Sequence, residues 1–226
     1  MDSALTSLLA ASLAFVGTPF ARSHPLRAPL AARIGEKGFL LLYSLVALAT
    51  FAWMVLAFRA APTADLGGSG EIGWAIATLL TLPALVLSLG SLRGNPAFPN
   101  PGAAKPIERA PSGVYAVTRH PMMWGFALWA LAHIVLWWST RTLIVAGAVL
   151  FLALVGAHLQ DRKKAALLGD GWSGWAAQTS YWPRWGKLLS AGWVLWSVSV
   201  TLWLVVTWAH IGAAGVPAGI WRWIGV

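Results

Sequence analysis

The chain has 226 residues, of which 58% are hydrophobic and 10% charged, with a formal net charge of +9 and no cysteine. Soluble domains carry about 25% charged residues, so this composition excludes an ordinary soluble domain and predicts a protein that crosses a membrane several times. The absence of cysteine excludes disulfides, thiolate catalysis and cysteine-ligated metals or clusters.

Six apolar segments approach or reach the length of about 20 residues that a bilayer crossing requires. In chain order they cover residues 3–21, 38–58, 72–92, 121–138, 142–159 and 191–211. We therefore predict an all-α, polytopic transmembrane bundle of about six helices, with residues 1–226 forming a single membrane domain. The first segment lacks the basic start and cleavage site of a signal peptide and is predicted to be a retained span.

The positive charge follows the predicted topology. Thirteen of the sixteen Lys and Arg residues fall in three alternate connections, residues 22–37, 93–119 and 160–190. Since basic loops favour the cytoplasmic side of a membrane, both termini are predicted to lie outside. This distribution indicates the lipid bilayer as a partner and argues against nucleic acid.

The fourth segment carries a histidine at each end. Arg119, His120 and Pro121 open it, and proline suits the first turn of a helix. With about 1.5 Å of rise per residue, His133 lies about 20 Å beyond His120. That depth is past the midpoint of a hydrocarbon core about 30 Å thick, where an ionisable side chain indicates a functional site. The alternative is a neutral histidine hydrogen-bonded to a neighbouring helix.

One face of this segment is aromatic. Phe126, Trp129, His133 and Trp137 follow one another at spacings of three or four residues and form one helical stripe. Such a stripe is typical of a haem-ligating helix, because haem iron is commonly held by imidazole in an aromatic pocket. It is equally typical of an ordinary buried packing face, and the pattern alone does not separate the two.

Several motifs together resemble the NnrU family of integral membrane proteins, over about residues 10 to 185. The motifs are Phe15–Thr18, Ser23–Arg27, Arg33, Gly35-Glu36, Leu42–Leu45, Thr118–Gly125, Leu128–His133, Asp161–Lys164, Trp172 and Thr179-Ser180. The resemblance implies a bacterial inner membrane protein associated with denitrification or nitrogen-oxide metabolism, with respiratory or denitrification membrane proteins as partners. It leaves open whether the protein is an enzyme.

Relatives of that family, the 15-cis-zeta-carotene isomerases, bind haem b through two histidines. The resemblance therefore implies haem b, with His133 as the leading ligand beside Trp129, and redox or isomerase-like chemistry on a lipid-soluble substrate. The second family ligand follows Gly-Thr in the first helix, but here Gly17-Thr18 precedes Pro19, which cannot ligate iron. His24 is the nearest substitute.

The pairing of ligands stays open at this point. Two axial ligands need similar depths in the membrane, a condition that His24 with His120 meets better than His24 with His133. His133 with His210 meets it as well, if one helix is tilted or offset.

The Arg-His-Pro motif has a second, more distant similarity, to the isoprenylcysteine and phospholipid methyltransferases, in which it lines an S-adenosylmethionine pocket. Arg119 and His120 would then be cofactor-binding residues, although Met123 and Asp161-Arg162 depart from the methyltransferase pattern. Arg119 could alternatively bind a phosphate or carboxylate, or anchor the helix at lipid headgroups. Asp161 is predicted to pair with Arg119 or Arg162. A further alternative is a non-enzymatic membrane assembly factor.

Tryptophans gather after the fifth segment. Trp172, Trp175, Trp182 and Trp185 predict a short amphipathic helix that lies in the membrane interface as an aromatic anchor.

Overall fold

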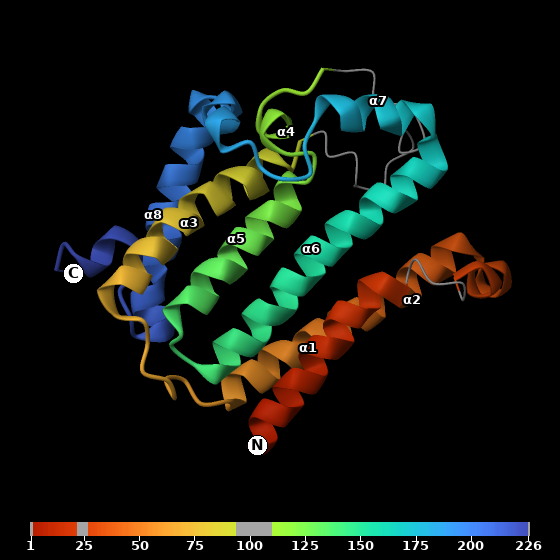
Figure 1. Ribbon diagram of the computed structural model, residues 1–226. Coiled ribbons are helices and arrows are strands. Elements are labelled where there is room, and N and C mark those ends of the chain that lie inside the picture. The colour runs from red at the N-terminus through yellow and green to blue at the C-terminus, as the bar shows by residue number, and fades with distance from the viewer. Residues whose placement is uncertain (1, 22–26, 94–109, 226) are drawn as a thin grey trace. The chain divides into compact units, whose positions relative to one another are not determined.

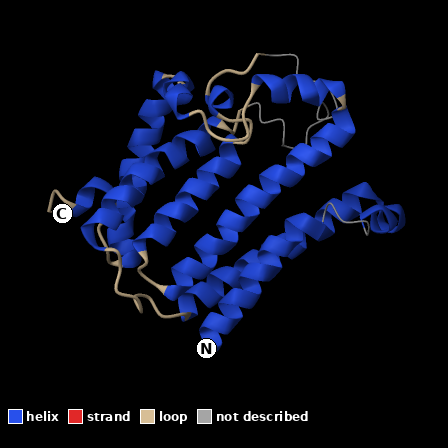
Figure 2. Cartoon of the chain, in the orientation of Figure 1, coloured by secondary structure: helices blue, strands red, loops and turns tan. Residues whose placement is uncertain are grey.

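The computed structural model describes residues 2–21, 27–93 and 110–225, and these form helices and loops with no strand among them (Figure 2). The all-α prediction is confirmed. The elements, labelled in Figure 1 where there is room, are α1 (Ser3–Ala21), α2 (Arg27–Ala60), α3 (Gly70–Gly90), α4 (Val114–Val117), α5 (Pro121–Leu136), α6 (Thr140–Leu168), α7 (Asp170–Gln178), η1 (Trp185–Ala191), α8 (Trp193–Ala214) and η2 (Gly219–Arg222).

Four helices within the described residues are long and apolar enough to cross a membrane: Pro29–Ala60, Gly70–Gly90, Thr140–Leu168 and Trp193–Ala214. Two shorter apolar helices, Ser3–Thr18 and Pro121–Leu136, accompany them. The length and composition of these helices support multi-pass membrane character, while the count of six crossings stays a prediction.

Two helices extend beyond the apolar segments seen in the sequence. α6 continues to Leu168 instead of ending at residue 159, so its last turns carry Asp161 and Lys164. α2 begins at Arg27 instead of residue 38, and Gly35 interrupts its helical backbone with φ 74° and ψ 161°. Hydropathy marks only the apolar part of a helix and misses polar turns that continue the same hydrogen bonding.

The chain divides into two compact units, of which the first comprises residues 1–68 and 137–152. α1 and α2 lie side by side in it (Figure 1). Their core consists of Leu5, Leu8, Ala11, Met54, Ala57 and Ala61. Arg141 donates from Nη1 to the carbonyl oxygens of Phe58 and Ala61, at 3.2 and 3.1 Å. These carbonyls lie at the end of α2, where backbone acceptors lack partners within the helix and attract a cation.

The second unit comprises residues 69–136 and 153–226, and α3 packs against both α5 and α8 in it. Small residues bring α3 and α5 together: a Cβ at Gly125 would lie 2.1 Å from Ser88 Oγ and 2.7 Å from the Ala84 carbonyl oxygen. Close approach through glycine is a common device of membrane helices. α8 is tied to α3 by Trp203, whose Nε1 donates to Thr81 Oγ1 at 2.9 Å.

Candidate functional site

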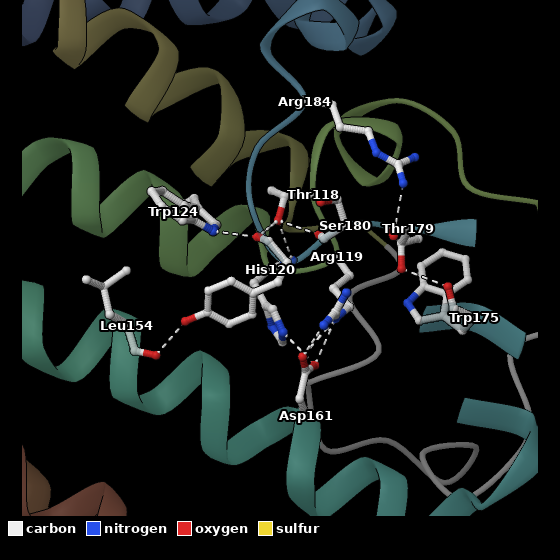
Figure 3. Close-up of polar contacts among 11 residues, drawn as sticks. Thr118, Arg119, His120, Trp124, Leu154, Asp161, Trp175, Thr179, Ser180 and Arg184 are labelled. Atoms are coloured by element: carbon white, nitrogen blue, oxygen red, sulfur yellow. Dashed lines mark hydrogen bonds and ion pairs between the residues drawn. The ribbon is translucent and has the colours of Figure 1, made fainter. Parts of the chain in front are cut away.

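A polar cluster in the second unit centres on Asp161 (Figure 3). His120 Nε2 lies 2.7 Å from Asp161 Oδ1, and Arg119 Nε lies 3.0 and 2.9 Å from the two carboxylate oxygens. Arg119 Nη2 adds a further contact to Oδ2. We call Arg119, His120 and Asp161 the Asp161 cluster. Of the two partners predicted for Asp161, Arg119 is the one it pairs with.

The backbone before α5 is held by an unusual set of hydrogen bonds. Thr118 is extended (φ −154°, ψ 152°), and its hydroxyl lies within hydrogen-bond distance of the carbonyl oxygens of Ser180 (3.1 Å) and Tyr181 (2.8 Å). Arg119 N–H donates to the Ser180 carbonyl at 2.9 Å, and Trp124 Nε1 donates to the Tyr181 carbonyl at 2.8 Å. The segment after α7 therefore fixes the position of the Arg-His-Pro motif.

Local sequence explains why α5 begins where it does. Proline disfavours helical backbone in the residue that precedes it. His120 therefore lies at the helix boundary, and Pro121 lies in the first turn of α5. The His120 carbonyl oxygen accepts the first helical hydrogen bond, from Trp124 N–H at 3.0 Å. The His120 side chain is 3% exposed, and those of Arg119 and Asp161 are 15% and 17% exposed. The ion pair is thus largely removed from solvent.

Tyr181 lies beside the cluster, with its ring 5.5 Å from the His120 ring. Its hydroxyl donates to the Leu154 carbonyl oxygen at 2.8 Å. Burial raises the pKa of the Tyr181 phenol above its ordinary value, and the negative charge of Asp161 raises it further. This phenol stays protonated at neutral pH and holds the loop against α6.

An open cavity of about 650 Å³ adjoins the cluster, and we call it the Asp161 cavity. It is lined by Arg119, Leu154, Val155, His158, Asp161, Tyr181 and Trp182. The lining combines apolar and aromatic residues with the charged pair and an exposed imidazole. The cavity is large enough for a small organic molecule.

The other end of α5 has a different arrangement. His133 Nδ1 lies 2.7 Å from the Trp129 carbonyl oxygen, and the two rings are 4.2 Å apart. On α8, His210 Nδ1 likewise lies 2.7 Å from the Val206 carbonyl oxygen. Because a carbonyl only accepts, Nδ1 carries the hydrogen in each neutral ring and Nε2 keeps its lone pair.

The aromatic stripe on α5 points away from the core of the second unit. Phe126, Trp129 and Trp137 are exposed and His133 is half-buried, whereas the buried face of α5 includes Gly125, Leu128 and Ala132. Phe126 and Trp129 are therefore not part of the buried face through which α5 packs within this unit.

The predicted site residues fall into two places. Arg119 and His120 join Asp161 at the start of α5, and Trp129 and His133 lie together near its end. The structure does not bring His120 to His133, and His24 lies outside the described residues. Among the described residues, no group of three or more His, Asp or Glu side chains is arranged to hold a metal ion.

Sequence reasoning missed the loop that completes the cavity. Tyr181 and Trp182 line the cavity, but nothing in the sequence indicated a role in binding. His158 could have been found, because it lies three residues before Asp161 and therefore shares a helical face with it. The prediction of interfacial anchors was wrong for Trp172 and Trp175, which are 5% and 1% exposed. Trp175 packs on the Tyr115 ring at 6.3 Å, so these side chains face the protein interior.

Comparison with known families gives one match, to the family described as NnrU protein, over residues 7–218. No curated protein and no solved structure matches the chain.

Proposed function

The chain belongs to the NnrU family, and from this premise we propose that it binds haem b within the bilayer, where His133 and His210 would hold the iron. The observation that carries the proposal is the hydrogen bonding of the two imidazoles. Each Nδ1 is bonded to a carbonyl oxygen of its own helix, and no described residue hydrogen-bonds to either Nε2. A histidine that ligates a metal almost always has its other nitrogen fixed in this way.

The surroundings of His133 fit a haem ligand as well. The Trp129 ring lies beside the imidazole, and the exposed Phe126 extends the aromatic face along the helix. Flat aromatic side chains next to a porphyrin exclude water and tune its potential. His210 would supply the second imidazole from α8. It would take the place of the family histidine of the first helix, where this chain has Pro19.

Bound haem b supplies one-electron redox chemistry. His133 and His210 would hold its iron, and the aromatic side chains beside His133 would keep water away. The resemblance noted in the sequence supports a role for this activity in denitrification or nitrogen-oxide metabolism, or in isomerase-like chemistry on a lipid-soluble substrate. It also implies the bacterial inner membrane, with respiratory or denitrification membrane proteins as partners.

The proposed topology has six crossings with both termini outside. In this topology α1 and α5 span the membrane in addition to the four longer helices. With its 16 residues, α5 is about 24 Å long. The Asp161 cluster lies at the basic, cytoplasmic end of α5, and His133 lies near the opposite side.

Absorbance of the detergent-purified protein tests the haem proposal. We expect a Soret band, with sharp α and β bands after dithionite reduction. His133→Ala and His210→Ala should each abolish the low-spin spectrum, whereas His158→Ala, a matched change of an exposed histidine, should leave it intact. An unchanged spectrum in both ligand variants would refute the assignment, and loss of the low-spin spectrum in His24→Ala would move the second ligand to that residue.

A second candidate function is S-adenosylmethionine-dependent methyl transfer. The convergence of Arg119, His120 and Asp161 beside one cavity favours it, because the methyltransferases place the same motif at their cofactor. Calorimetric titration with S-adenosylmethionine tests this candidate. Saturable binding that Asp161→Asn removes would support it, and absence of heat in a protein shown to be folded would eliminate it.

A further inference from the structure

We propose that the Asp161 cavity binds an uncharged, lipid-soluble molecule whose head presents carbonyl oxygens, the chemistry of a quinone. The proposal concerns a different part of the molecule from His133 and His210 and does not depend on haem. It rests on the charge balance of the cavity lining, on its hydrogen-bond donors and on its position along α6.

The charges that line the cavity cancel. Arg119 and Asp161, which both line the cavity, form a close ion pair. Both oxygens of Asp161 already accept hydrogen bonds, so no carboxylate oxygen is left without a donor to attract a cationic head. Equally, an anionic head would find the guanidinium of Arg119 already paired with Asp161. This lining suits a head without net charge.

The lining nevertheless offers hydrogen-bond donors. Arg119 uses Nε and Nη2 on Asp161, and its Nη1 has no hydrogen-bond partner in the described part of the chain. The exposed His158 ring has no such partner there either. The Tyr181 hydroxyl already donates its hydrogen to the Leu154 carbonyl oxygen and is not free for a ligand. A ligand with carbonyl oxygens can accept hydrogen bonds from the free N–H groups of Arg119 and His158.

The apolar part of the cavity lies further along α6. Leu154 and Val155 precede Asp161 by about two turns, so the lining extends about 10 Å from apolar side chains to charged ones. Trp182, 66% exposed, and Tyr181 add flat aromatic surfaces. A ring with a hydrocarbon tail fits this gradient, with its carbonyls at the polar end and its tail along α6.

Equilibrium binding of radiolabelled decylubiquinone to the detergent-purified full chain tests the inference. We expect saturable binding, at least about tenfold weaker in Val155→Trp, which fills the apolar part of the cavity. Leu167→Trp is the matched control on the same helix, because Leu167 is exposed and outside the cavity. His158→Phe, which keeps a ring but removes the donors at an exposed position, should weaken binding about fivefold, the effect of one hydrogen bond.

Competition identifies the class of ligand. Displacement of the label by unlabelled decylubiquinone and not by decyl phosphate supports an uncharged head. Displacement by dioctanoylglycerol as well would assign the site to any carbonyl-headed lipid, within the proposed chemistry. Stronger displacement by decyl phosphate or S-adenosylmethionine, or binding that neither Val155→Trp nor His158→Phe alters, would overturn the proposal.

Discussion

The two histidines of α5 occupy opposite kinds of surroundings. His120, at the first turn, is buried and its Nε2 is engaged by the Asp161 carboxylate. His133, in the last turn, is half-buried and bonded only through Nδ1 to the carbonyl oxygen of Trp129 on its own helix. The difference teaches that the Nε2 of His120 is used within the fold, whereas the Nε2 of His133 has no hydrogen-bond partner among the described residues.

Removal of Asp161 should produce the largest effect on this comparison. Asp161→Ala leaves Arg119 and His120 without their shared acceptor in a largely dry site, and breaking such a pair costs about 3–5 kcal/mol. We expect a large fall in the melting temperature in detergent. Arg162→Ala, a change of the exposed neighbour, should alter it little. A melting temperature unchanged in Asp161→Ala would show that the Asp161 cluster does not stabilise the fold.

The middle of α5 should respond next most strongly. In Gly125→Ala the added Cβ meets Ser88 Oγ and the Ala84 carbonyl oxygen of α3, and overpacking of this kind costs about 1–3 kcal/mol. Gly156→Ala is the control, because nothing lies within 4 Å of its Cβ position and alanine favours a helix. Thermal unfolding should show a loss for the first variant and none for the second. Equal stability of the two variants would mean that α3 and α5 lie further apart than the structure shows.

Matched substitutions of the two histidines sharpen the comparison directly. His120→Phe removes a charge-assisted hydrogen bond from a buried site and should destabilise the protein by about 1.5–3 kcal/mol. His133→Phe, at a half-buried and apolar position, should change the stability of the haem-free protein by less than about 0.5 kcal/mol. Unfolding of both variants prepared without haem provides the measurement. A larger loss for His133→Phe would reverse the assigned roles.

The smallest effect should come from the exposed carboxylate of Asp65, whose contribution to stability can be compared with that of the largely buried Asp161. The Thr140 side chain and its backbone N–H, which donates to Asp65 at 2.8 Å, lower the pKa of this carboxyl below its usual value of 3.8. A depressed pKa stabilises the folded state above the unfolded pKa, and this contribution disappears as the pH falls through the folded value. Wild type should therefore melt slightly above Asp65→Asn at pH 7, with the difference shrinking towards pH 3. A difference that grows on acidification would contradict the assignment.

Much of the fold was accessible from hydropathy, because apolar segments 3–21, 72–92 and 191–211 correspond closely to α1, α3 and α8. The polar extensions of α2 and α6 were not, since a hydropathy pattern ends where charged side chains begin. In the site, the Arg119–Asp161 pair was one of two predicted alternatives. The loop with Tyr181 was missed because its carbonyl oxygens, which the sequence does not encode as a motif, make the decisive contacts with Thr118 and Trp124.

The most direct test of the two roles is the haem content of His120→Phe and His133→Phe, measured by absorbance after expression with added haem precursor. We predict that His120→Phe, though less stable, retains the Soret band and the reduced α and β bands of wild type, and that His133→Phe loses them. A wild-type spectrum in His133→Phe, or loss of haem from folded His120→Phe alone, would contradict the assignment of His133 as the ligand.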